Sequence, residues 1–279
     1  MIPNCLRGVH REPDGIYSFT QGNAEQAEEI KFRNSEERFE KTAIMQYVGR
    51  HHSLPVMNHE VRKFLGKVTE GGVILDIGGG KGWHWREAQK ARPDIKIIIM
   101  DMVRESLESA KIFFSEELDK TVFLLHADAL SIPLPPNSLD AIWSVQALQH
   151  VPDFDGAVME ASRVLRPGGL FVNYSLNQDY LKIFLRAFSN NKSESGQRFP
   201  GKYWLARGSS KQEQAIARAF KGKVSVYFSE ILFSPRLKLN SNGRLGKSMG
   251  FIDRYLVSDQ RLFKFFARQI SYHCRKNVN

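Results

Sequence analysis

Short apolar runs alternate with amphipathic stretches through the middle of the chain. The apolar runs have the length of strands and are rich in β-branched residues, which is typical of buried parallel strands. They cover residues 73–75, 96–100, 122–125, 141–145 and 170–174. Apolar residues at helical spacing predict helices over 83–91, 104–117 and 154–165. Strand and helix in regular alternation predict an α/β fold with a parallel sheet covered on both faces.

The flanking segments have a different pattern. Before the first strand, helical spacing predicts helices over 23–48 and 56–68. After the fifth strand, the pattern predicts helices over 181–188, 211–220 and 251–267, a glycine-rich turn over 243–250, and strands over 224–233 and 269–275. No internal repeat or low-complexity tract interrupts the chain.

A glycine-rich loop follows the first strand at once. It reads Asp76-Ile77-Gly78-Gly79-Gly80-Lys81-Gly82. Its spacing fits neither the dinucleotide-binding pattern Gly-x-Gly-x-x-Gly nor a phosphate-binding loop that ends in Gly-Lys-Ser/Thr. Acids also end the second and third strands, at Asp101 and Asp128. Acids at adjacent strand ends beside a glycine loop indicate a cofactor that contains adenosine but no pyrophosphate.

Together these motifs resemble the class I S-adenosylmethionine-dependent methyltransferases, in particular the ubiquinone/menaquinone-biosynthesis type. The resemblance covers roughly residues 70–176 and rests on VILDIGGGKG, HADALSIPLPPNSLDAIWSVQALQHVPD and EASRVLRPGGLFV. It implies a Rossmann-like, seven-stranded, mostly parallel sheet whose last strand runs antiparallel. It also implies a helical lid over residues 1–69 and a methyltransferase domain over 70–279, in which residues 177–221 form an insert at the acceptor site.

The resemblance further implies which residues hold S-adenosyl-L-methionine. Asp76 and the glycine loop would surround its methionine part, Asp101 its ribose, Met102 and Asp128 with Ala129 its adenine, and Gln146 its amino-acid end. Tyr47 or Arg50 of the lid would meet its carboxylate. The full expected set is Tyr47, Arg50, Asp76, Gly78, Gly79, Gly80, Gly82, Asp101, Met102, Asp128, Ala129 and Gln146.

Methyl transfer from a sulfonium is a direct in-line displacement, so the protein mainly supplies proximity and alignment. It requires no metal, and no zinc-type spacing of Cys and His is present. An acceptor of high pKa needs a base, for which His150, Tyr174 and His51 are the candidates. Aromatic residues of the last third are expected to line the acceptor pocket or to pack in the core. They are Phe184, Phe188, Phe199, Tyr203 and Trp204.

Charge is concentrated in the last third of the chain. Residues 1–176 carry 20 basic and 24 acidic side chains (20 − 24 = −4), and residues 177–279 carry 20 and 6 (20 − 6 = +14). This asymmetry indicates an anionic acceptor, with a solvated basic surface as the alternative. Phe263, Phe265 and Phe266 lie among basic residues, and we expect them to pack on the sheet, with contact to a membrane surface as the alternative.

Three functions are compatible with these patterns. The first is a methyltransferase acting on a small molecule or a sugar- or lipid-linked intermediate. The alternatives are an RNA methyltransferase, which no added RNA-binding domain favours, and a non-catalytic cofactor-binding protein. No stretch has the length of a signal peptide or membrane helix. With only Cys5 and Cys274, expected to be reduced, the sequence predicts a cytoplasmic protein.

Overall fold

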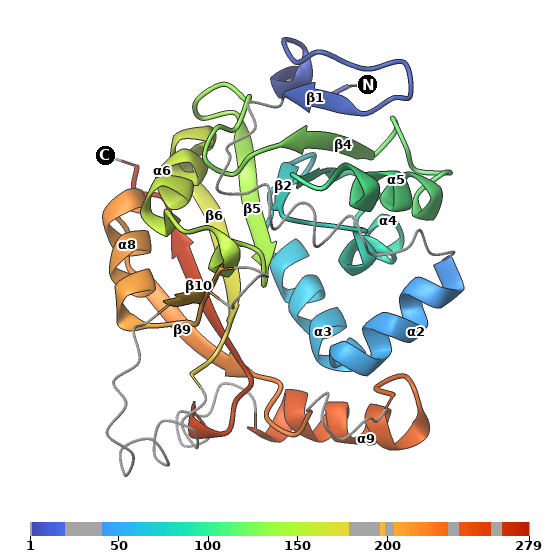
Figure 1. Cartoon of the computed structure of the whole chain (residues 1–279), viewed down its shortest axis with the longest axis vertical. Coiled ribbons are helices and arrows are strands. Elements are labelled where there is room, and N and C mark those ends of the chain that lie inside the picture. The colour runs from blue at the N-terminus through green and yellow to red at the C-terminus, as the bar shows by residue number, and fades with distance from the viewer. Residues whose placement is uncertain are drawn as a thin grey trace.

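The computed structural model describes residues 2–19, 41–178, 196–198, 204–233, 240–257 and 264–278. Its centre is an eight-stranded sheet in the order β1-β4-β3-β2-β5-β6-β10-β9 (Figure 1). The strands are β1 (Tyr17–Phe19), β2 (Val73–Ile77), β3 (Lys96–Asp101), β4 (Val122–Ala127), β5 (Leu139–Val145), β6 (Leu165–Leu176), β9 (Val224–Ser229) and β10 (Gln269–Arg275). A separate pair joins β7 (Gly196–Arg198) and β8 (Trp204–Ala206).

The directions of the strands confirm the expected Rossmann-like arrangement. The strands from β1 to β6 in this order pair in parallel, and β10 is antiparallel to both β6 and β9. The expected number of seven strands is corrected to eight, because β1 adds an edge strand in which Tyr17 pairs with Leu125. A three-residue strand carries too short a pattern to be recognised in a sequence, and its pairing with β4 stabilises it.

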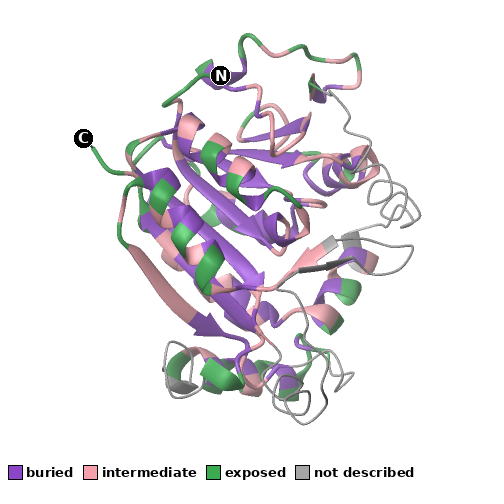
Figure 2. Ribbon diagram, turned by 60° about the vertical axis from the view of Figure 1, so that its left-hand side comes forward, coloured by how far each residue is buried: buried purple, intermediate pink, exposed green. Residues whose placement is uncertain are grey.

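Helices cover both faces of the sheet (Figures 1 and 2). They are α2 (Lys41–His51), α3 (Leu54–Leu65), α4 (Ala88–Ala91), α5 (Arg104–Phe113), α6 (Phe154–Val164), α8 (Ser210–Phe220) and α9 (Arg244–Ile252). Successive residues of β3 face opposite sides: Ile98 and Met100 belong to the core beneath α6 and α8, and Ile97 and Ile99 to the core beneath α3 and α5. This alternation explains why the strand is apolar throughout.

Some of the predicted helices are confirmed, and others are divided or lie outside the described residues. Those over 104–117, 154–165, 211–220 and 56–68 are confirmed by α5, α6, α8 and α3, and the part of 23–48 from residue 41 onward lies in α2. The helix predicted over 83–91 is divided into a 3₁₀ turn, η3 (Trp83–Trp85), and the short α4. The prediction over 181–188 falls outside the described residues, as do Phe184, Phe188, Phe199, Tyr203 and the side chain of Trp204.

The turn predicted over 243–250 is wrong, because α9 occupies it. Its two glycines lie where the helix touches the rest of the protein. A Cβ atom at Gly250 would lie 2.7 Å from Pro55 Cβ, and one at Gly246 would lie 2.5 Å from Ser241 Cα. The glycines therefore permit close packing of a helix, and this contact outweighs their low helix propensity.

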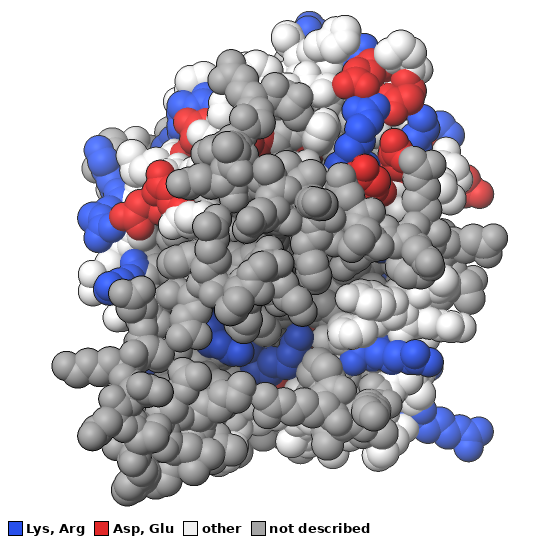
Figure 3. Space-filling model, in the orientation of Figure 1, with Lys and Arg blue, Asp and Glu red and all other residues white. Residues whose placement is uncertain are grey.

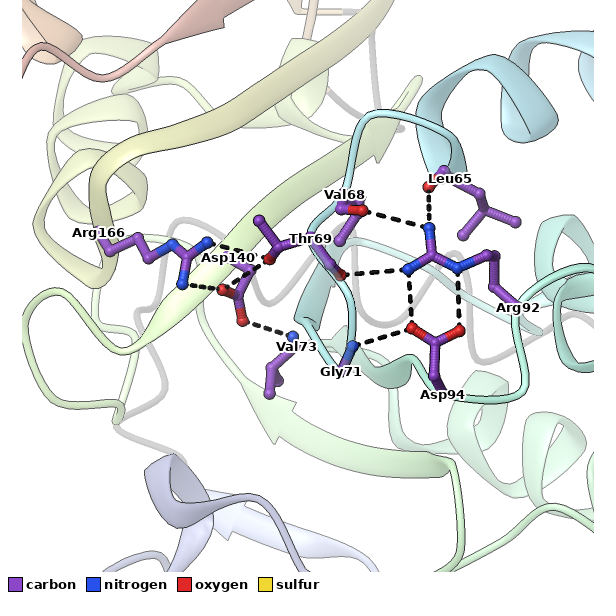
Figure 4. A network of polar contacts seen from close by, with 9 residues as sticks. All are labelled: Leu65, Val68, Thr69, Gly71, Val73, Arg92, Asp94, Asp140 and Arg166. Carbon is purple, nitrogen blue, oxygen red and sulfur yellow. Dashed lines mark hydrogen bonds and ion pairs between the residues drawn. The ribbon is translucent and has the colours of Figure 1, made fainter.

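A network of ion pairs fastens the sheet at the edge where the parallel strands begin (Figure 4). Arg92 pairs with Asp94 at 2.7 Å and donates to the carbonyl of Leu65 at 2.7 Å. Asp94 in turn accepts from Gly71 N, and Asp140 accepts from Val73 N. These contacts fix the starts of β2, β3 and β5 relative to α3. The glycine loop lies at the opposite edge, where these strands end.

The two cysteines lie in the core beneath α6 and α8 and are not bridged. Burial raises the pKa of each thiol to about 11. Within the described residues, no helix combines the length and the apolar character needed to cross a bilayer.

Candidate functional site

The glycine loop lies between β2 and η3 in a conformation that favours glycine. Gly78, Gly80 and Gly82 have φ values of +67°, +54° and +69°, in the left-handed region that side chains disfavour. Gly79 N donates to Met100 O at 3.0 Å, and Gly80 N donates to Asp101 Oδ2 at 2.8 Å. The loop is thus hydrogen-bonded to the end of β3.

The same loop closely approaches the end of β5. A Cβ atom at Gly78 would lie only 2.1 Å from Ala147 Cβ. The next strand end therefore touches the loop directly, and the ends of β2, β3 and β5 meet at one place. This is the edge of a parallel α/β sheet at which ligands bind.

Asp76 lies beneath the loop and is fully buried. The indole Nε1 of Trp85 donates to Asp76 Oδ2 at 2.8 Å, whereas Oδ1 makes no hydrogen bond within the described part of the chain. Burial raises the pKa of this carboxyl to about 7, and the nearby Asp101 also acts to raise it. A buried carboxylate oxygen without a donor is costly unless a ligand satisfies it.

The expected adenosine-contacting residues lie half-buried at the ends of β3 and β4. They are Asp101, Met102, Asp128 and Ala129. Asp101 Oδ1 accepts from Val103 N at 2.8 Å, and Asp128 Oδ1 accepts from Leu130 N at 2.9 Å. Each carboxylate therefore shapes its own turn at the end of a strand.

Gln146 follows β5 in a strained conformation. Its φ is +55°, its backbone N–H donates to Tyr174 O at 2.7 Å, and its side-chain Nε2 is buried without a hydrogen-bond partner among the residues described. A non-glycine residue held in the left-handed region is typical of functional sites. The structure thus brings Gln146 to the same edge as Asp76 and the glycine loop.

One predicted base, Tyr174, is buried and hydrogen-bonded. Tyr174 is only 1% exposed, packs against Trp143, and donates its hydroxyl to Glu60 Oε2 of α3 at 2.8 Å. Its hydroxyl therefore lies in the core beneath α3, and its role as a base stays a prediction. The sequence places Tyr174 correctly at the end of a strand but does not reveal on which face its side chain lies.

His150 and the residues of the expected lid have distinct surroundings. His150 ends the 3₁₀ turn η4 (Leu148–His150) after β5, half-buried, with Nε2 at 3.3 Å from Gln149 Nε2. On α2, Tyr47 is 46% exposed and Arg50 is exposed. His51 stacks on Tyr47 at 4.1 Å, and its Nδ1 lies 2.8 Å from the Tyr47 carbonyl oxygen. These contacts tie His51 to its own helix.

Neighbouring residues that sequence reasoning did not select point inward instead. His52 lies 5.3 Å from Trp83, and His84 stacks on Trp83 at 3.9 Å. His52 Nδ1 and both ring nitrogens of His84 are buried without a hydrogen-bond partner in the described regions. Burial lowers the pKa of His52 to about 4 and holds that of His84 well below its ordinary value. The only sequence feature that could have pointed to these histidines is the bulky run Trp83-His84-Trp85 after the loop.

The junction between α2 and α3 is held from the C-terminal part of the chain. Ser53 N donates to Glu230 Oε1 at 2.8 Å, and Ser241 Oγ donates to His52 O at 2.7 Å. Glu230 is fully buried and paired with Arg268. Segments far apart in sequence therefore jointly place His52 beside Trp83.

Comparisons with known proteins relate the chain to one family. Residues 75–173 match the family described as methyltransferase domain. Demethylmenaquinone methyltransferase of Lactococcus lactis subsp. lactis (strain IL1403) is 30% identical over 172 residues, covering 61% of this chain and 66% of that protein. Sterol 24-C-methyltransferase erg6 of Aspergillus fumigatus is 32% identical over 108 residues, covering 38% of this chain and 28% of that protein. The chain thus spans less than two thirds of these relatives.

A solved structure shows the same fold. Geranyl diphosphate C-methyltransferase from Streptomyces coelicolor A3(2) superposes with a TM-score of 0.61 at 12% identity, covering 92% of this chain and all of that one. The fold and the matched motifs define the class: the chain contains a class I S-adenosylmethionine-dependent methyltransferase domain. In the described residues, no group of three His, Cys, Asp or Glu side chains is arranged to hold a metal ion.

Proposed function

We propose that the chain transfers a methyl group from S-adenosyl-L-methionine to a small-molecule acceptor, and that this acceptor is lipid-like or lipid-linked. The observation that carries the proposal is Asp76 Oδ1, which is buried without a donor, among the described residues, beside a loop of left-handed glycines. The methionine part of the cofactor carries an ammonium group that would satisfy it. The relatives named for a quinone and a sterol favour a lipid-like acceptor.

Different residues of this chain would have different roles in such a reaction. Asp76, the loop amides and Gln146 would hold the methionine part, and Asp101 and Asp128 the adenosine. The bound cofactor supplies a methyl group already activated on a sulfonium. Alignment of donor and acceptor would then contribute about 7–11 kcal/mol. The aromatic ring of Trp83 and the α2–α3 junction would keep water from the reacting groups.

Deprotonation of the acceptor would fall to His150. It lies just after β5, next to the turn that holds Gln146 and Ala147, and imidazole is the side chain most often used as a general base. The neutral imidazoles of His52 and His84 offer nitrogens that no described residue satisfies, on the side of the lid. We assign them to hydrogen bonding with the acceptor, because burial keeps them uncharged.

The test has two parts. Calorimetric titration with S-adenosylhomocysteine measures cofactor binding, and we expect saturable binding at one site. Incubation of cell extract with cofactor that carries a deuterated methyl group then identifies the labelled compound by mass. Absence of cofactor binding would refute the proposal, and label appearing in RNA alone would replace the small-molecule acceptor with a nucleic acid.

The pH dependence of cofactor binding tests the role of Asp76. Its pKa of about 7 in the free protein exceeds the ordinary value of 3.8, so below that pH the carboxyl is largely neutral and attracts an ammonium group weakly. We expect the affinity for S-adenosylhomocysteine to rise between about pH 5.5 and about pH 7.5 as the carboxylate forms. Isothermal titration at a series of pH values measures this change.

The matched variant is Asp76→Asn, whose amide oxygen still accepts from Trp85. It should bind weakly and show no rise over the same pH range. The raised pKa of Asp76 also affects the free energy of unfolding. The folded protein binds the proton of this carboxyl more tightly than the unfolded chain does, so the stability present below about pH 4 is lost as the pH rises through about 7. The free wild-type protein should therefore lose more stability than D76N over that interval, and equal profiles would contradict the assignment.

A further inference from the structure

We propose that one end of the molecule docks on an anionic lipid bilayer through a docking face. Its apolar side chains are Leu245, Phe251, Ile252, Tyr255, Phe265 and Phe266. Its basic side chains are Arg244, Lys247 and Lys264. The docking face consists of α9, the π-helical turn that follows it (Asp253–Val257), and residues 264–266. Docking itself does not depend on the proposed function, whereas its link to a lipid-like acceptor rests on that function.

Helix α9 exposes its large apolar side chains, whereas an ordinary surface helix buries them. Its buried face carries Gly246 and Gly250, and the turn adds Asp253, which is fully buried and accepts from Leu232 N. Its large apolar side chains point away from the protein instead: Leu245 is 59% exposed and Phe251 is 54% exposed. A helix that packs small residues against the protein and directs large apolar residues outward has an apolar face available for contact with an apolar partner or a membrane.

Residues 264–266 add two exposed aromatic rings. Phe265 is 59% exposed and Phe266 is 72% exposed, so the expectation that these rings pack on the sheet is wrong for both, and Phe263 lies outside the described residues. The short segment lies at the same end of the molecule as α9 (Figure 1). Both are fastened to the same junction, α9 through Ser241, which bonds His52, and the segment through Arg268, whose partner Glu230 bonds Ser53.

The charge at this end selects an anionic partner. The described residues 240–257 and 264–270 carry five Lys and Arg against one Asp (5 − 1 = +4). Arg244, Lys247 and Lys264 are exposed next to the apolar side chains. In the view of Figure 3, the described carboxylates gather in the upper half of the molecule, and the few described charged side chains in the lower half are mainly Lys and Arg. Exposed aromatic and aliphatic groups surrounded by cations match the interface of a bilayer that contains anionic lipids.

The docking face adjoins the candidate site. Ser241, just before α9, bonds the backbone of Gly49, His52 and Leu54 at the α2–α3 junction. Helix α9 also packs on α3 through Gly250 and Pro55. A bilayer in contact with α9 would therefore lie next to the segment that carries His52, on the side where we place the acceptor. This position suits an acceptor taken directly from the membrane.

Co-sedimentation of the full chain with vesicles tests docking. Vesicles of phosphatidylcholine are compared with vesicles that contain about one third phosphatidylglycerol. We expect about tenfold or greater preference for the anionic vesicles, diminishing with added salt. The double variant Phe265→Ser/Phe266→Ser should lower partitioning by about tenfold or more. The triple variant R244Q/K247Q/K264Q should abolish the preference for anionic lipid.

Met159→Ser and Ile112→Ser provide matched controls, because both side chains are 58% exposed but lie on α6 and α5. They should sediment as the wild type does, and all variants should keep its thermal midpoint. Equal binding to neutral and anionic vesicles, no binding, or equal losses in the controls would overturn the proposal. The proposal would also be overturned if neither the wild type nor any variant bound vesicles and F265S/F266S instead disrupted a dimer or a complex with RNA. Calorimetry with S-adenosylhomocysteine is unaffected by these outcomes and judges the proposed function separately.

Discussion

Replacement of Gly78 by Ala is expected to destabilise the protein by about 2–5 kcal/mol and to abolish cofactor binding at ordinary concentrations. The new Cβ atom would lie 2.1 Å from Ala147 Cβ, at a residue whose φ is +67°. The left-handed conformation costs a side chain about 1–2 kcal/mol, and relief of the overlap must separate the loop from the end of β5 at a further cost of about 1–3 kcal/mol. Urea unfolding measures the loss of stability, and calorimetry measures the loss of affinity.

The chain offers a matched control in Gly71, which has the same φ of +67° and has no described atom within 4 Å of the position that a Cβ atom would take. Gly71→Ala should cost only the conformational part, about 1–2 kcal/mol, and should leave cofactor binding unchanged, since it lies before β2 at the other edge of the sheet. The pair Gly78→Ala/Ala147→Gly should recover stability relative to Gly78→Ala alone. Equal destabilisation by G78A and G71A would show that the contact with Ala147 is unimportant.

Replacement of Asp101 by Ala is expected to weaken binding of S-adenosylhomocysteine by about 1–3 kcal/mol, or about five- to 150-fold. The carboxylate accepts from Gly80 N and Val103 N, each at 2.8 Å, and we also assign it to the ribose hydroxyls. Its loss leaves the loop amide without its acceptor and the ribose without its partner. Titration calorimetry measures the affinity, and thermal unfolding shows that the variant is folded.

Asp101→Asn separates the two roles, because an amide oxygen accepts one backbone N–H but carries no charge. Its affinity should fall between those of the wild type and D101A. Asp155→Ala, an exposed acid paired with Arg218, should behave as the wild type. If D101A folds normally and binds the ligand with unchanged affinity, Asp101 does not belong to the cofactor site.

The central motifs can be read from the sequence because their signals are local. A glycine loop after an apolar strand requires left-handed residues at fixed spacing, and the structure has them at Gly78, Gly80 and Gly82. Likewise, the ends of successive parallel strands must meet at one edge, so the sequence alone groups Asp76, Asp101 and Asp128. The expected antiparallel final strand is also confirmed by β10.

The features that the sequence does not reveal depend on contacts between distant segments. The sequence does not reveal that Glu60, 114 positions before Tyr174, accepts a hydrogen bond from its hydroxyl in the core. It also does not reveal that His52 points inward, which follows from the hydrogen bonds of Ser53 to Glu230 and of Ser241 to the His52 carbonyl. It predicts a turn in place of α9 because glycines are unfavourable in an isolated helix, while their packing against Pro55 and Ser241 is favourable.

The sequence by itself determined the parallel α/β core, the glycine loop and the acids around it, because short-range geometry forces each of them. Only the tertiary structure decided which of the aromatic and histidine side chains are buried and which face of α9 remains exposed. The physical reason is that a side chain's direction depends on the packing of its element against partners far away in the chain, and periodicity alone does not specify those partners.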